Sequence, residues 1–114
     1  MNLEHEELKR VDIFRASGRI DSSNAQQFED ALTEKIKKDG RGNLVVNLKD
    51  VEYMSSAAIR ALIAALKETR GKMLGAGNVV LVEVPPHIRE VFDLAAITSL
   101  FTFYDTEAQA VGSF

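Results

Sequence analysis

Apolar positions along the chain follow two spacings that alternate from one segment to the next. Short runs rich in Val, Ile, Leu and Phe are typical of strands, and they predict strands over residues 3–8, 11–20, 43–48, 79–82 and 100–103. Between them, apolar residues recur every three or four positions, which is the spacing of one helix face. This spacing predicts helices with buried faces over 25–36, 59–66 and 88–95, and a small helix through 108–111 capped by Asp105 or Thr106. Strands that alternate with helices indicate an α/β fold with a largely parallel sheet.

The residues between these segments predict turns and helix boundaries. Residues 9–10 form a turn between the first two strands, so we expect the sheet to open with an antiparallel hairpin. Ser23 followed by Gln26 fits a capping box at the start of the first long helix. Gly71 is expected to end the second helix, and residues 72–78 to form a Gly-containing loop before the next strand.

Length and composition bound the function. The chain has 114 residues, 46% apolar and 27% charged, which predicts one soluble globular domain over residues 1–114. It has no cysteine, so a disulfide, a thiolate nucleophile and a cysteine zinc site are excluded. The two histidines, His5 and His87, lie far apart without metal-ligand spacing. We therefore expect a protein that is not an enzyme and holds no metal or cofactor.

Charge and hydropathy indicate whether the chain binds nucleic acid, enters a membrane or is exported. The formal net charge is -3 and no basic run is present, which argues against direct binding of nucleic acid. The apolar stretch 57–66 contains Arg60 and is too short to span a bilayer, so we expect no membrane insertion. The acidic first ten residues lack the order of a signal peptide. The expectation is a cytoplasmic protein, with a monomer as the favoured state.

The turn that carries Ser55 and Ser56 is the most informative place in the chain. A strand is expected to lead into it and a helix to start directly after it, where backbone N–H groups lack partners. One interpretation is that a serine caps the helix. The other is phosphorylation, because a phosphate at a helix start meets free N–H donors and the positive end of the dipole. The two interpretations are compatible, since a capping hydroxyl at a loop edge is also reachable.

Three segments resemble the STAS domain of bacterial anti-sigma-factor antagonists. They are GRID at 18–21, LVVNLKDV at 44–51 and YMSSAAIRAL at 53–62. The family typically has G-x-[IL]-D, a hydrophobic strand ending in Asp and an apolar residue, and an aromatic residue followed by hydrophobic-D-S-[SAT]-G-L-x-x-L. The resemblance covers nearly the whole chain. It implies a STAS-like mixed, largely parallel sheet with an N-terminal antiparallel hairpin, covered by about four helices.

The resemblance also implies a site. The serine after the motif aspartate is the family's phosphoacceptor, which places that role on Ser56. Ser55 stands where the family has aspartate, and Ala58 where it has glycine. Ser55 is therefore an alternative acceptor. The implied partner-binding surface comprises Asp21, Ser22, Ser23, Ser55, Ser56, Ala57, Ala58 and Arg60.

The function that the resemblance implies is partner switching in the control of transcription. The unmodified protein would bind an anti-sigma factor that is also a serine kinase, phosphorylation of Ser56 would end the interaction, and a phosphatase would restore it. ATP would belong to the kinase. The alternative is a non-switching STAS scaffold or regulatory subunit of a larger assembly, which the missing motif aspartate favours. A small nucleotide-binding or hydrolytic enzyme is disfavoured, because no paired nucleophile and base are visible.

Overall fold

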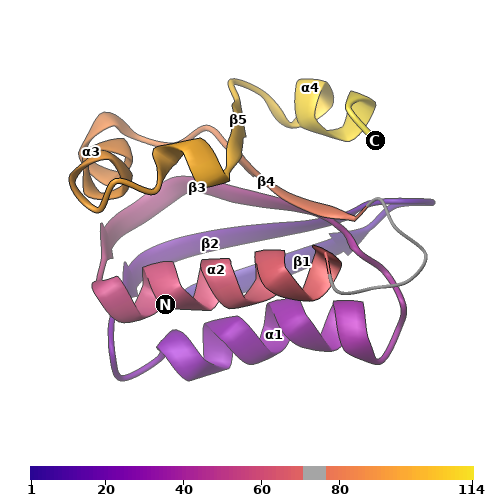
Figure 1. Ribbon diagram of the computed structural model, residues 1–114, viewed down its shortest axis with the longest axis horizontal. Coiled ribbons are helices and arrows are strands. Elements are labelled where there is room, and N and C mark those ends of the chain that lie inside the picture. The colour runs from indigo at the N-terminus through magenta and orange to yellow at the C-terminus, as the bar shows by residue number, and fades with distance from the viewer. Residues whose placement is uncertain (71–76) are drawn as a thin grey trace.

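A mixed sheet of five strands forms the centre of the protein (Figure 1). The computed structural model describes residues 1–70 and 77–114. The strands lie side by side in chain order: β1 (Asn2–Glu7), β2 (Asp12–Ile20), β3 (Asn43–Met54), β4 (Asn78–Val82) and β5 (Thr102–Tyr104). β1 pairs with β2 in the antiparallel sense and the other neighbours are parallel. The predicted opening hairpin and largely parallel sheet are confirmed.

Helices cover both faces of this sheet. Among the described residues they are α1 (Ala25–Lys37), α2 (Ser56–Arg70), α3 (Pro86–Leu94) and α4 (Glu107–Gly112), with a 3₁₀ turn at Thr98–Leu100. α1 and α2 lie together on one face, whereas α3 and α4 lie on the other (Figure 1). The predicted cover of about four helices is confirmed. In the part of the chain that the structure describes, no helix combines the length and apolar character needed to cross a membrane.

The buried side chains form two clusters, of which the larger also contains Ile88 and Phe92 of α3. Leu44, Val46 and Leu48 belong to the larger cluster, which includes the buried faces of α1 and α2. Val45 belongs to the smaller cluster, which α4 closes with Ala110. Because successive strand residues point to opposite faces, β3 needs apolar residues at consecutive positions. This requirement accounts for the nearly continuous apolar run at 44–48.

β3 is longer than the sequence predicted, since it continues from Leu48 to Met54. Two register shifts against β2 place extra residues on β3 in this stretch. Bulges of this kind let Lys49 and Asp50 remain exposed while Val51 and Met54 return to the core. The prediction ended too early because the polar residues interrupt the apolar run. As a result, β3 ends directly at the serine pair.

The capping box predicted for α1 is wrong. Asn24 occupies the N-cap position, and its side chain makes no capping hydrogen bond. The Ser23 N–H and hydroxyl both donate to Asp21 Oδ1, at 3.0 and 2.6 Å. Gln26 donates instead to Asp30, one turn along the helix. The Ser23 hydroxyl is thus used as a donor to the Asp21 carboxylate within the loop, and Ser23 lies one residue before the N-cap.

The C-terminal elements follow the prediction with small shifts. Of the two residues considered for the terminal helix, Thr106 is the N-cap and forms a capping box with Gln109. The last strand begins at Thr102 because Leu100 belongs to the 3₁₀ turn. Gly71, expected to end α2, and residues 72–76 of the loop expected at 72–78 lie outside the described residues. Asn78, placed in that loop by the sequence, is instead the first residue of β4.

Candidate functional site

The site predicted from the sequence lies at the carboxyl ends of β2 and β3. Ile20 and Met54 are register partners in these parallel strands, and Ser55 N donates to Ile20 O at 2.9 Å. Asp21 and Ser55 are the next residues along their strands, so the structure brings their two loops to the same edge of the sheet. The structure thus brings together two segments that the sequence separates by more than thirty positions. Ala58 is the exception among the predicted surface residues, because it is fully buried.

Ser55 is engaged by the helix that follows it. Ser55 O accepts the Ile59 N–H at 3.1 Å, and Ser55 Oγ accepts the Ala58 N–H at 3.3 Å. These are the bonds of an N-cap residue, which satisfy donors that would otherwise lack partners in the first turn. The Ser55 side chain is half-buried. The capping interpretation therefore applies to Ser55.

Ser56 is the first residue of α2 and is exposed. Its hydroxyl forms no hydrogen bond with any residue that the structure describes. Ala57 beside it is half-buried, and Ala58 is fully buried on the inner side of α2. Of the two candidate hydroxyls, the one at Ser56 is thus the more accessible to another protein.

The Asp21 loop is held together by its own polar groups. Besides the two bonds from Ser23, Asp21 N donates to Asn24 Oδ1 at 2.9 Å and Asn24 Nδ2 donates to Arg19 O at 3.0 Å. The Ser23 hydroxyl and then the Ser23 N–H keep the pKa of Asp21 below its ordinary value. Asp21 is therefore a carboxylate at neutral pH. Ser22 is exposed at the tip of this loop.

Arg19 and Tyr53 add a feature that sequence reasoning did not assign. They are register partners on β2 and β3, and the Arg19 guanidinium lies 4.4 Å from the centroid of the Tyr53 ring. Tyr53 is 42% exposed. Tyrosine and arginine are enriched among residues that dominate protein interfaces. The available signal was their place inside the two motifs at 18–21 and 53–62, but the stacking depends on the register of the strands.

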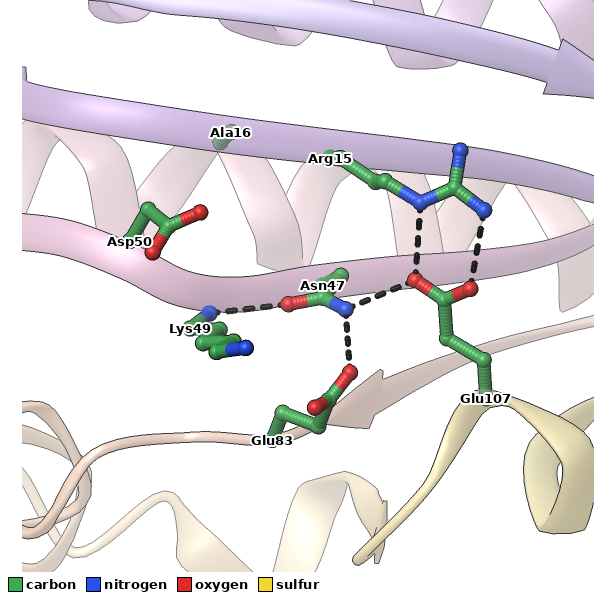
Figure 2. A pocket seen from close by; sticks show the side chains of 7 residues that line it. All are labelled: Arg15, Ala16, Asn47, Lys49, Asp50, Glu83 and Glu107. Carbon is green, nitrogen blue, oxygen red and sulfur yellow. Dashed lines mark hydrogen bonds and ion pairs between the residues drawn. The ribbon is translucent and has the colours of Figure 1, made fainter.

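A polar pocket of about 280 Å³ lies elsewhere, on the α4 side of the sheet (Figure 2). Arg15 donates to both carboxylate oxygens of Glu107, from Nε at 2.9 Å and from Nη2 at 2.8 Å. Asn47 Nδ2 donates to Glu107 Oε2 at 2.7 Å and to Glu83 Oε2 at 2.6 Å. The lining residues are Arg15, Ala16, Asn47, Lys49, Asp50, Glu83 and Glu107.

This network fastens α4 to the sheet. Asn47 is 6% exposed, and its Oδ1 accepts the Lys49 N–H at 2.9 Å, so its amide uses both donor and acceptor. The hydrogen bonds from Arg15 are the main cause that lowers the pKa of Glu107, and Asn47 adds to the effect. The sequence signal for this cluster was a single asparagine inside the apolar run at 44–48.

The pKa of Glu107 leads to a prediction about acid stability. A carboxyl whose pKa is lowered by folding stabilises the folded state at pH values above its ordinary pKa, which is 4.5 for glutamate. This stabilisation is lost as the pH falls through the lower pKa of the folded state. Glu107→Gln should therefore be less stable than the unmodified chain at pH 6, and the difference should shrink below pH 4.5. Urea unfolding at several pH values measures it. Glu90→Gln, at an exposed position of α3, is the control, and a difference for Glu107→Gln that does not vary with pH would contradict the prediction.

Neither histidine faces the serine pair. His5 Nε2 lies 2.7 Å from Asp12 Oδ1, and the His5 ring stacks on Phe14. His87 Nε2 lies 3.1 Å from Glu52 O. Within residues 1–70 and 77–114, no three His, Asp or Glu side chains converge as metal ligands would. The groups that meet at the candidate site are hydroxyls, one carboxylate and two arginines.

The fold and this site define a small α/β domain whose candidate functional region is an exposed surface at the strand ends. Residues 2–110 match the STAS domain model. The chain therefore belongs to the STAS domain family, as the resemblance of its motifs indicated.

Several similar proteins are named anti-sigma factor antagonists. BtrV of Bordetella bronchiseptica, provisionally named an anti-sigma factor antagonist, is 33% identical over 85% of this chain and 80% of its own length. The structure of an anti-sigma factor antagonist from Mycobacterium paratuberculosis superimposes with a TM-score of 0.82 at 27% identity, covering 98% of this chain and 92% of that one.

SpoIIAA, an anti-sigma factor antagonist, provides a comparison in two states. Its unphosphorylated form has a TM-score of 0.83 at 18% identity and covers 98% of this chain and 95% of its own. The phosphorylated form of the Bacillus protein has a TM-score of 0.74 at 18% identity and covers 98% of each chain. At this identity the likeness shows the fold, and the predicted mixed sheet with four helices matches it.

Proposed function

We propose that this protein is an anti-sigma factor antagonist that acts by partner switching. The unphosphorylated chain binds an anti-sigma factor that is also a serine kinase, and the sigma factor is released for transcription. Phosphorylation of Ser56 ends the interaction, and a phosphatase restores it. The observation that carries this proposal is the exposed Ser56 hydroxyl on the first residue of α2, at the edge where the Asp21 loop also lies.

The two serines have different surroundings, and this difference supports Ser56 as the acceptor. A kinase must reach the hydroxyl, and Ser56 is exposed whereas Ser55 is half-buried and bonded to the Ala58 N–H. The relatives named anti-sigma factor antagonists, and the existence of SpoIIAA in a phosphorylated form, support the same role.

The physical basis of the switch is electrostatic. A phosphate adds close to two negative charges. At the start of α2 the domain compensates for them with free N–H donors and the helix dipole, so the fold tolerates the modification. A partner that covers Ser56 has no equivalent compensation and meets added bulk and charge on a chain whose net charge is already -3.

The chain itself transfers no group in this proposal, and ATP is bound by the kinase. We further propose that residues 1–114 act as one domain, as a monomer, in the cytoplasm. A non-switching scaffold or regulatory subunit is the second candidate. The observation that favours it is Ser55 in the position of the family aspartate, with its hydroxyl used as a helix cap.

Affinity capture followed by intact-mass measurement tests the proposal. The unmodified chain and Ser56→Asp serve as baits in lysate of the source organism, and we expect a GHKL-type kinase that only the unmodified chain retains. That kinase, purified and supplied with ATP, should add the mass of one phosphate to the chain and none to Ser56→Ala. Modification of Ser56→Ala would place the phosphate elsewhere, with Ser55 the first residue to map. If the chain binds the captured partner but gains no phosphate after incubation with ATP, the result would support the second candidate, a non-switching scaffold.

Phosphorylation should change the surface without remodelling the fold. Backbone NMR shift differences between the two forms should therefore cluster at residues 55–60, which open α2, and at residues 21–24 in the adjacent loop. The β4 strand and the α3 helix should be unaffected, because they carry no group that the phosphate is expected to contact. Widespread shifts in these two elements would argue for a conformational switch and against the electrostatic one.

A further inference from the structure

Arg60 lies one helical turn after Ser56 on the exposed side of α2. Both residues are exposed. Side chains four positions apart on a helix are neighbours, with Cβ atoms roughly 5–6 Å apart. Long helical side chains also lean toward the N-terminus of their helix, so we expect the Arg60 side chain to reach the turn that carries Ser56.

Arg60 is a cation without an assigned partner. Arg15 and Arg41 both donate to carboxylates, at 2.8 and 2.6 Å. In contrast, Arg60 forms no ion pair or side-chain hydrogen bond with any residue in the described ranges. Other charged groups near this surface include Arg19, which lies over the Tyr53 ring, Asp21, which accepts from Ser23, and the N-terminal amino group, whose charge acts on Asp21.

We propose that Arg60 binds the phosphate of phosphorylated Ser56 within the same chain. This inference rests on the proposed function for the origin of the phosphate. An anion four residues before a cation is the favourable order on a helix. The phosphate, on the first residue of α2, also meets the positive end of the helix dipole. The guanidinium group offers a planar pair of N–H donors that fits two phosphate oxygens.

The consequence concerns how the switch works. In the unmodified chain, Arg60 is a surface cation available to an acidic group of the partner. After modification, the phosphate occupies it. Phosphorylation then alters the surface twice at one place, because it adds an anion and withdraws a cation. This effect is stronger than the addition of negative charge alone, and it explains why an arginine within the motif segment 53–62 is useful to a regulated surface.

The test uses the full chain with phosphoserine installed at position 56 by genetic encoding, so no kinase is needed. The second pKa of the phosphate, about 6 in a free phosphoserine, is followed by phosphorus NMR. Arg60→Gln should raise it by about 0.2–0.4 of a unit, the size expected for an exposed helical pair. Arg60→Lys should retain part of the effect, and about 1 M salt should diminish it.

Two further variants make the test specific. Arg89, on α3, is stacked over Phe103 at 3.8 Å and serves as the matched control, so Arg89→Gln should leave the phosphate pKa unchanged. Arg19→Gln tests the other arginine of the site. No change in Arg60→Gln, or a larger change in Arg19→Gln, would overturn the proposal.

The outcome is independent of whether a kinase acts on this chain. Failure of the proposed function would appear as an unmodified mass after incubation with the captured partner and ATP. Failure of the present inference would appear as an unchanged phosphate pKa in Arg60→Gln. The melting temperature of unphosphorylated Arg60→Gln should equal that of the unmodified chain, because the substituted side chain is exposed.

Discussion

Leu62→Asp is expected to unfold the protein. Leu62 is fully buried on the face of α2 that covers the sheet, within the main core cluster. Removing a buried leucine side chain costs about 2–5 kcal/mol, and burying a carboxylate without a partner costs several more. Domains of this size have a total stability of about 5–15 kcal/mol. Circular dichroism and urea titration should show a loss of cooperative unfolding at 25 °C.

The same substitution on the surface is the control. Leu94, at the end of α3, is 80% exposed, so Leu94→Asp should change the free energy of unfolding by less than about 0.5 kcal/mol. The two variants differ in burial while the chemical change is identical. If Leu62→Asp unfolded at the same denaturant concentration as the unmodified chain, the assignment of the buried face of α2 would be wrong.

Ser56→Asp is expected to bind the partner kinase poorly, whereas Ser56→Ala binds it as the unmodified chain does. Alanine removes the exposed hydroxyl without adding charge, and the adjacent Ala57 shows that a small side chain suits this surface. Aspartate places a negative charge where the proposed interface covers the start of α2. Like charges and desolvation there cost a few kcal/mol, which corresponds to a loss of about 10²-fold or more in affinity. Calorimetric titration with the captured kinase measures both variants.

Ser99→Asp separates the effect of position from the effect of charge. Ser99 is exposed in the 3₁₀ turn that follows α3, so this variant carries the same added charge outside the proposed interface. Its affinity should be close to that of the unmodified chain. Equal affinities of Ser56→Ala and Ser56→Asp would exclude Ser56 from the switch.

The sequence determined the elements and their buried faces because both depend on local spacing. The recurrence of Ile59, Leu62, Ile63 and Leu66 predicted the inner face of α2. Three of these are buried, and Ile63 is half-buried against the main core cluster. The sequence also predicted that the two serines lie at the start of a helix. Only the tertiary structure assigned different roles to the two serines. Ser55 N extends the hydrogen bonding of β3 to β2, and the Ser55 hydroxyl accepts from the first turn of α2, whereas Ser56 is exposed.

Contacts between distant segments were decided only by the tertiary structure. Arg15 and Glu107 are 92 positions apart, and Arg19 meets Tyr53 only because two register shifts in β3 set that pairing. Asp12, a charged residue within the predicted strand 11–20, is fully buried and accepts from Arg41 at 2.6 Å. Periodicity fixes which face of an element is apolar, since it acts over three or four residues. The partners of buried charges depend on strand order and register, which the whole chain must fold to establish.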